Sequence, residues 1–186
     1  MNLQQEYEEA AVFWEKVDTD AKKMPGEAVQ KALDQFLGTH RLCVLATACR
    51  TFTRATALEY TWHDGCFWIF SEGGQKFRAL VENANVGLTV FDPDFRPGKV
   101  RAVQCEGTGG LVPYLSETYL KAAEKIGLTL EKLDKLPAPL HLIRVRPSSF
   151  LVLDSRFREN GYGVRQHLAG QQSSETTDSS RAGLQG

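Results

Sequence analysis

The chain has 186 residues, of which 42% are hydrophobic and 24% are charged, and this balance is typical of a single soluble domain with a substantial core. Its formal net charge of -1 excludes the overall basic excess with which proteins bind nucleic acids or anionic membranes, but it does not exclude a local basic patch. The acidic N-terminal segment does not resemble a signal peptide and no apolar run has the length of a membrane span, so we expect a cytoplasmic protein.

The first part of the chain predicts two helices. Residues 3–22 are rich in Glu, Ala, Gln and Lys and are expected to form an exposed helix, which Pro25-Gly26 ends. Apolar residues recur at helical spacing over Glu27–Leu37 and predict a second helix, with Gly38 as its stop.

Strand signals dominate the rest of the chain. The predicted strands are Arg41–Cys49, Phe52–Trp62, Cys66–Phe70, Val86–Phe91, Lys99–Val112, His141–Arg146 and Phe150–Leu153. The turn His63-Asp64-Gly65 joins the second and third strands as a hairpin. In the fifth strand, Gln104 and Glu106 share one face and could line a pocket. Bends or bulges in this strand are expected at Gly107, Gly109 and Gly110.

Shorter helices are predicted between these strands. The first covers Gly74–Glu82, and its apolar face consists of Phe77, Leu80 and Val81. Ser116 is a good N-cap for a helix that runs through Ile126, and Thr129 begins a further short helix.

The order of these elements predicts a mainly β fold. At least six strands follow one another in a largely antiparallel order, with flanking and inserted helices, and crossover helices do not alternate regularly with the strands. A small barrel fits this order better than a doubly wound parallel sheet. We expect one domain over residues 1–168 with its core at about 30–155, and a disordered polar tail over residues 169–186.

The strand Cys66–Phe70 is apolar on both faces. A barrel strand with one face in water should alternate between apolar and polar residues, so something must cover the second face. Either a helix of the same chain or a second subunit could do so, and we favour a second subunit.

Metal and thiol chemistry are not indicated by the sequence. The four cysteines, Cys43, Cys49, Cys66 and Cys105, form no CxxC pair and have no spacing of a zinc site. We expect buried free thiols in a reducing compartment. The aspartates form no metal-like cluster, and no catalytic triad is visible, so no catalytic residue is assigned.

The loop Ser71–Lys76 and the strand that carries Arg54 could hold a phosphate. Small residues stand at the mouth of a helix, Lys76 lies in its first turn, and Arg54 lies on a nearby strand. The alternative is structural: the two glycines only form a turn, and Arg54 pairs with a carboxylate such as Glu59 or Glu72.

Four motifs resemble one family in their order and spacing. They are RATAL at Arg54–Leu58, CFWIFSEGGQK at Cys66–Lys76, ENANVGLTVF at Glu82–Phe91 and VQCEGTGGLV at Val103–Val112. Over roughly residues 30–150 the chain resembles the pyridoxamine 5'-phosphate oxidase-related family, the FMN-binding split barrels.

This resemblance implies a six-stranded antiparallel split β-barrel of Greek-key type that forms a homodimer with FMN at the subunit interface. By position, Arg54 and Lys76 match residues that bind the FMN phosphate. The strand residues that match those facing the isoalloxazine ring are Ala55, Thr56, Ala57 and Leu58. The loop residues that match those beside the ribityl phosphate are Phe70, Ser71 and Gln75.

The chain also departs from the family pattern. Glu59 stands where the oxidases have a basic residue, and Gly74-Gln75 stands where they have Ser-Arg. Two positive charges are therefore missing, which argues against pyridoxamine phosphate as the substrate. Near the C-terminus, Arg165-Gln166-His167 is only a loose match to the oxidase pattern.

Two classes of function follow from the resemblance. The first is an FMN-dependent oxidoreductase that transfers hydride or electrons between an electron donor and an unknown small molecule. The second is a module that binds or stores flavin, deazaflavin or haem without turnover, and His63 or His167 would then be the candidate haem ligand. A structural protein with an empty pocket is a third reading.

Overall fold

The computed structural model describes residues 2–94 and 96–170. Its strands are β1 Leu42–Ala48, β2 Thr53–Glu59, β3 Thr61–His63, β4 Cys66–Ser71, β5 Asn85–Phe91, β6 Arg101–Val112, β7 His141–Asp154 and β8 Arg165–Ala169. Its helices are α1 Leu3–Ala11, α2 Phe13–Asp20, α3 Gly26–Thr39, α4 Gln75–Glu82, α5 Glu117–Lys125 and α6 Leu130–Asp134, with a 3₁₀ helix η1 at Ser155–Asn160.

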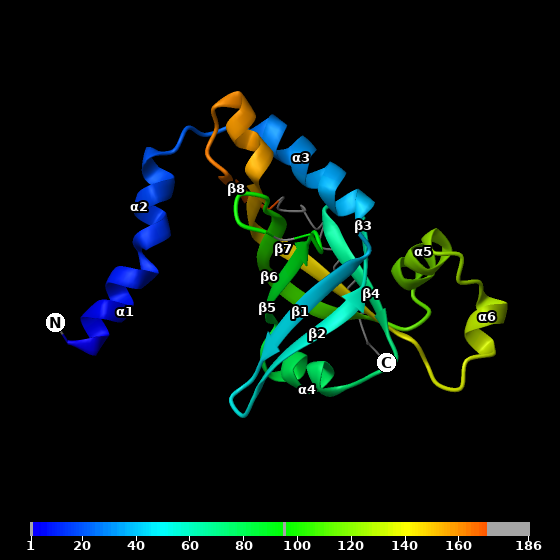
Figure 1. The fold of residues 1–186 in the computed structure, drawn as a ribbon. Coiled ribbons are helices and arrows are strands. Elements are labelled where there is room, and N and C mark those ends of the chain that lie inside the picture. The colour runs from blue at the N-terminus through cyan, green and yellow to red at the C-terminus, as the bar shows by residue number, and fades with distance from the viewer. Residues whose placement is uncertain (1, 95, 171–186) are drawn as a thin grey trace, which may run out of the picture.

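All the strands belong to one antiparallel sheet that curls into a barrel (Figure 1). The order of the strands is β2-β1-β5-β6-β7-β4-β3, and β8 pairs with β7 beside this path. Only Tyr60 separates β2 from β3, so one bent segment forms both ends of the path and closes the barrel. When β2 and β3 are taken together, six strands form the barrel and β8 is added to them, which confirms the predicted mainly β split barrel.

The barrel core is formed by alternate strand residues and by one face of α3. On β5, Val86, Leu88 and Val90 point inward and pack with α3 in one apolar cluster. The helix residues in this cluster are Val29, Leu33, Phe36 and Leu37, as the helical spacing predicts. The helix continues through Gly38 to Thr39, two residues beyond the predicted end at Leu37.

The predicted hairpin between β3 and β4 is confirmed. Its turn residues Asp64 and Gly65 have φ values of 53° and 67°. Both angles lie in the left-handed region that a two-residue hairpin turn of the common twisted type requires, and Asp and Gly tolerate it well.

Several boundaries differ from the sequence prediction. The first helix is interrupted at Val12 and gives α1 and α2. The two predicted strands near the C-terminal end are one continuous β7, which passes through Pro147 next to a bulge. Glu106 pairs with Ser149 and Gly107 pairs with Pro147, so Ser148 is the extra residue and the bulge is in β7. Ala169 pairs in β8, a strand that was not predicted, so the polar tail begins later than expected; residues 171–186 lie outside the described part of the chain.

Helices of the same chain cover the second face of β4. Phe67 and Ile69 point into the barrel core, whereas Cys66 and Trp68 pack in a second cluster below α5 and α6. The helix residues of this cluster are Tyr119, Ala122, Ala123 and Leu133. The expectation that a second subunit covers this strand is therefore wrong, because the helix pair inserted between β6 and β7 already does so.

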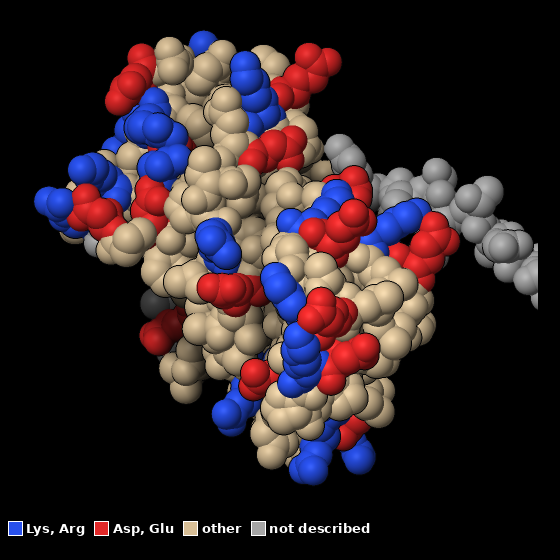
Figure 2. Space-filling view, turned by 90° about the vertical axis from the view of Figure 1, so that its right-hand side faces the viewer, with Lys and Arg blue, Asp and Glu red and all other residues tan. Residues whose placement is uncertain are grey.

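The outer surface of this helix pair is polar. On the face shown in Figure 2, which carries α5 and α6, acidic and basic side chains are interspersed. Lys121 pairs with Glu117 at 2.6 Å and Lys135 pairs with Glu131 at 2.5 Å, both at helical spacing. The pair thus has an apolar inner side on β4 and a solvated outer side.

The predicted apolar face of α4 is only partly correct. Phe77 and Leu80 pack against the barrel core, but Val81 is 86% exposed. The two residues of this helix that are fully buried are Lys76 and Ala79. A buried lysine on a short amphipathic helix is unusual, because lysine is almost never buried unless a partner compensates its charge.

Three of the four thiols are buried in this fold, and the fourth, Cys49, is partly exposed, with a pKa lowered by its hydrogen bond with Thr51. All four cysteines are free, and Cys43, Cys66 and Cys105 are buried. Burial raises the pKa of Cys43 and of Cys105 to about 12, so both thiols stay protonated at neutral pH. Among the described residues, no helix is long and apolar enough to span a membrane.

We expect Gly107→Ala to destabilise the barrel by about 2–3 kcal/mol, the upper range for overpacking. Gly107 lies at the register shift of β6, and a Cβ there would meet the Arg146 carbonyl oxygen at 2.2 Å. Gly110→Ala is the matched control, because no atom lies within 4 Å of its Cβ position. Denaturant unfolding of both variants tests this, and equal stabilities would contradict the bulge.

Candidate functional site

Two positively charged side chains converge at the end of the barrel nearest to α4. Arg54 is paired with Thr47 across β1 and β2, and it lies on the strand face of Leu58, which packs against the core. Lys76 lies in the first turn of α4, after the loop that follows β4. Gly74, with φ of 110°, gives this loop a backbone conformation that other residues rarely adopt.

Lys76 is 4% exposed although it carries a charge. Its ammonium donates a hydrogen bond to the Gly73 carbonyl oxygen and lies 5.0 Å from the centroid of the Phe77 ring. Burial lowers the pKa of Lys76, and the nearby positive charge of Arg54 lowers it further. The fold therefore holds two like charges close together at a cost in stability.

Among the described residues, no carboxylate compensates these two charges. In the described part of the chain, neither Arg54 nor Lys76 lies within ion-pair distance of an Asp or Glu. The structural alternative, in which Arg54 pairs with Glu59 or Glu72, is thus not found. An anion between the two side chains would relieve their repulsion and satisfy their donors.

The remaining predicted loop residues lie at different distances from this pair. Ser71 is buried, and its hydroxyl donates to the Gly73 carbonyl oxygen at 3.4 Å. Gln75 is exposed at the start of α4. Phe70 points to the other side of β4, where its ring contacts Tyr119 edge-on at 5.5 Å. Only the backbone of Phe70 can therefore face the cluster of positive charges.

Two adjoining grooves lie outside the barrel, on the outer face of β1, β5 and β6. The first, the Arg54 groove, has a volume of about 660 Å³ and includes Arg54 and Ala55. The second, the His167 groove, has a volume of about 730 Å³ and extends to β7 and β8. Both grooves are lined by Ala46, Gly87, Glu106 and Ser148, so they form one continuous depression.

The floor of this depression is made of small residues. Ala46 and Gly87 are paired across β1 and β5, and Ala55 is paired with Ala46 on the other side. Thr47 also borders the Arg54 groove, but its side chain is on the inward strand face of Cys43 and Leu45, where its buried hydroxyl has no hydrogen-bond partner within the described residues. The flat floor of small residues suits a planar ligand.

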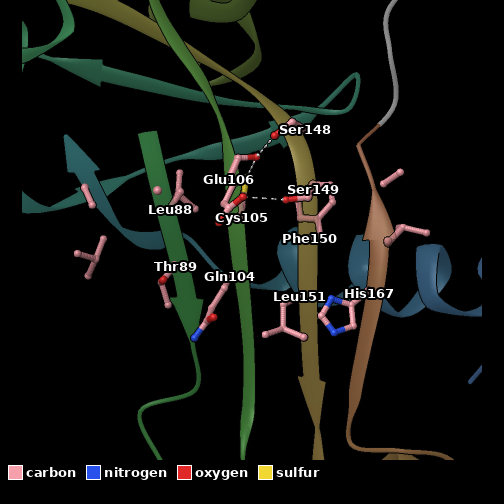
Figure 3. A pocket seen from close by; sticks show the side chains of 15 residues that line it. Leu88, Thr89, Gln104, Cys105, Glu106, Ser148, Ser149, Phe150, Leu151 and His167 are labelled. Atoms are coloured by element: carbon pink, nitrogen blue, oxygen red, sulfur yellow. Dashed lines mark hydrogen bonds between the residues drawn. The ribbon is translucent and has the colours of Figure 1, made fainter. Parts of the chain in front are cut away.

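The polar groups of the His167 groove come from several strands (Figure 3). Gln104 and Glu106 lie on one face of β6 and line the groove, as the alternation in this strand predicts. On β7, the Ser148 hydroxyl donates to the Glu106 carbonyl oxygen at 3.1 Å, and Ser149 contacts the Glu106 carboxylate at 3.5 Å. Neither serine was predicted as a groove residue, because the sequence pattern indicates a gap between two strands there.

No protein-family model matches the chain, and no curated protein matches its sequence. Solved structures do match. An FAD-binding protein from Mesorhizobium loti is 20% identical, with a TM-score of 0.53 over 70% of this chain and 93% of its own. A protein assigned as a pyridoxamine 5'-phosphate oxidase, from Listeria innocua, is 16% identical, with a TM-score of 0.54 over 67% of this chain and 98% of its own. The chain has the pyridoxamine 5'-phosphate oxidase-like split-barrel fold. The resemblance that the four motifs indicate is thereby confirmed at the level of the fold.

A similar fold also occurs in a protein whose ligand is haem. HutZ, the haem storage protein from Vibrio cholerae, is 16% identical, with a TM-score of 0.52 over 67% of this chain and 91% of its own. The split barrel alone therefore does not decide between cofactors, and the decision depends on the side chains of the site.

Proposed function

We propose that this split barrel binds FMN, with the phosphate held between Arg54 and Lys76. The observation that supports this most is the convergence of two uncompensated positive charges, one of which is almost fully buried. A phosphate monoester is a dianion or nearly so, and it matches two such charges. Free backbone N–H groups at the start of α4 and the Ser71 hydroxyl would supply further donors.

In this proposal the flavin ring lies along β2, beside Ala55–Leu58, and over the floor of small residues. The floor leaves room for a planar ring without a steric clash, since Ala46 and Gly87 present almost no side chain. The backbone of β2 would bind the polar edge of the ring. The homodimer with FMN at the subunit interface belongs to the same proposal, because the depression is open on the outside of the barrel.

A bound flavin would supply hydride or electron transfer, and this makes an oxidoreductase the proposed activity. The chain itself would bind, orient and shield the cofactor. The His167 groove adjoins the proposed ring position and offers Gln104, Glu106 and Ser149 to a small polar substrate. No residue is assigned as a general acid or base.

The alternative is a haem-binding module without turnover, and the fold shared with HutZ supports it. A haem iron needs an axial ligand, most often a histidine. His63 is stacked on Trp68 at 4.9 Å and contacts Asp64 through Nδ1 at 2.9 Å, outside both grooves. His167 lines a groove, but its Nε2 contacts Asp18 at 2.9 Å. His167 uses its Nε2 for the contact with Asp18, which competes with iron binding through that nitrogen. The Nε2 of His63 is buried and has no hydrogen-bond partner among the described residues, but His63 lines neither groove, so the flavin is favoured.

The visible spectrum of the purified protein and a titration with FMN test the proposal. Flavin bands, or quenching of FMN fluorescence on addition of protein, are expected. Riboflavin is the matched control: it lacks the phosphate and should bind at least ten times more weakly. Reduction of the bound flavin by NADH or NADPH would separate an enzyme from a carrier. A Soret band would support haem, and a colourless protein that does not take up FMN would overturn the flavin proposal.

A further inference from the structure

The two N-terminal helices carry an exposed apolar stripe. Leu3, Tyr7, Trp14 and Val17 recur at intervals of three and four residues, or their multiples, and therefore share one side of the helical segment. Their exposed fractions are 64%, 65%, 51% and 42%, and Phe13 beside them is 54% exposed. The turn at Val12 keeps the helical hydrogen bonds on both sides, with Val12 N–H to the Glu8 carbonyl at 3.2 Å.

This segment, which we call the arm (Leu3–Asp20), has few contacts of its own. In α1 no residue is buried, and in α2 only Asp18 is buried. Helices of this length are marginal in water unless an apolar face is packed. The arm projects away from the barrel (Figure 1), so the described residues from 21 to 94 and from 96 to 170 do not supply that packing.

The C-terminal end of the arm is held at the edge of the His167 groove by contacts of Asp18. Arg165 on β8 donates from Nε to the Asp18 carboxylate at 3.0 Å, and His167 contacts the same carboxylate at 2.9 Å. Arg165 also lies 4.9 Å from the Trp14 ring centroid. Although burial opposes ionisation of Asp18, the hydrogen bonds from His167 and Arg165 hold its pKa below the usual range. The direction of the arm is therefore built into the fold.

We infer that the arm packs on a second copy of this chain, whose outer sheet face lies against the His167 groove. The groove and the arm are two unpartnered surfaces that meet at Asp18 and His167, so one partner placed in the groove lies beside the arm. Under two-fold symmetry each copy then receives the other's arm, and both surfaces are covered at once.

The exposed area of the arm is large enough to contribute to a stable dimer. The three aromatic residues alone leave roughly 300 Å² of apolar surface exposed, so that two arms bring roughly 600 Å² to one interface. The apolar area of the two arms and the area of the two sheet faces together approach the ~1,200–2,000 Å² of surface that a standard protein interface buries. A soluble monomer rarely leaves a stripe of this kind in water.

Charge argues against a membrane as the occupant. The arm carries six carboxylates against the single Lys16. Helices that lie on membranes usually combine an apolar face with lysine and arginine, because biological membranes are anionic. A protein surface does not require that basic face.

Sedimentation equilibrium of the full chain tests this inference, which does not depend on flavin binding. The wild type is expected to be a dimer at micromolar concentration. Leu3→Glu/Tyr7→Glu places two carboxylates in the stripe and should raise the dimer dissociation constant at least about tenfold. The matched control is Gln4→Glu/Gln5→Glu, which adds the same charge to the same turn outside the stripe, where both glutamines are exposed.

The melting temperature and the far-ultraviolet circular dichroism spectrum show that the variants remain folded. Because α1 buries no residue in the single chain, the stripe variant should melt like the control when both are monomeric. A monomeric wild type, or the same dissociation constant for the stripe variant and the control, would overturn the inference. So would binding of the wild-type chain to phosphatidylcholine–phosphatidylglycerol vesicles that the stripe variant no longer binds.

Discussion

Lys76→Met is expected to stabilise the ligand-free protein and, in the same variant, to weaken FMN binding. Methionine fills nearly the same volume as lysine without a charge. It removes the cost of burying the ammonium and its repulsion by Arg54, and it leaves the Gly73 carbonyl without this donor. Loss of one charge-assisted contact to the phosphate should cost about 1.5–3 kcal/mol of binding free energy.

The pH dependence distinguishes this effect from simple repacking. The pKa of Lys76 is lowered in the folded state, so its charge destabilises the fold at neutral pH, and this penalty disappears as pH rises toward the ordinary value of 10.5. The stability advantage of Lys76→Met should therefore be largest near neutral pH and shrink in alkaline solution. Denaturant unfolding of both proteins from pH 7 to pH 10 measures it.

Two further variants complete the comparison. Arg54→Met should weaken FMN binding by a similar amount, because Arg54 would hold the same phosphate. Arg78→Met removes a positive charge from the same helix, but Arg78 is exposed, whereas Lys76 is buried near Arg54, so the affinity should not change. Unchanged FMN affinity in both the Lys76 and Arg54 variants would refute the phosphate assignment. An equal loss in all three variants would show only a general effect of net charge.

The sequence predicted the features that depend on local signals. The hairpin at Asp64-Gly65 follows from two residues that tolerate the left-handed region, and α3 follows from its apolar spacing. The convergence of Arg54 and Lys76 was predicted from family motifs together with their spacing. What the sequence did not show is that Lys76 is buried, because a lysine in a first helical turn is usually solvated.

Features that depend on distant contacts were missed. The strand β8 is short and carries Arg165, Gln166 and His167, so it has no apolar alternation, and its pairing with β7 and its contacts to the arm define it. Pro147 concealed the continuity of β7, because proline usually interrupts a strand; here it lies at a bulge. Two-sided apolarity in β4 showed that something covers the strand, but the pattern contains no information on what does so.

The second large effect is expected in the helix pair α5 and α6, which covers the outer face of β4. Tyr119→Ala should destabilise the protein by about 3–5 kcal/mol, as for other large aromatic residues removed from a core. Tyr119 is completely buried, and its ring contacts Phe70 at 5.5 Å. Its hydroxyl donates to the Leu140 carbonyl oxygen at 2.7 Å. Tyr119→Phe, which removes only this hydrogen bond, should cost about 1 kcal/mol.

The same variant decides what role the helix pair has in assembly. Because α5 and α6 cover β4 within one chain, Tyr119→Ala should lower the melting temperature without changing the dissociation constant of the dimer at temperatures where the chain is folded. Tyr114→Ala is the control, since Tyr114 is 44% exposed and its ring centroid lies 5.2 Å from the ring centroid of Tyr119. The opposite result would be a Tyr119→Ala variant whose dimer dissociates while its folded monomer keeps wild-type stability. That result would mean that β4 and its helix pair form the subunit interface, and the arm would then not be needed to explain the dimer.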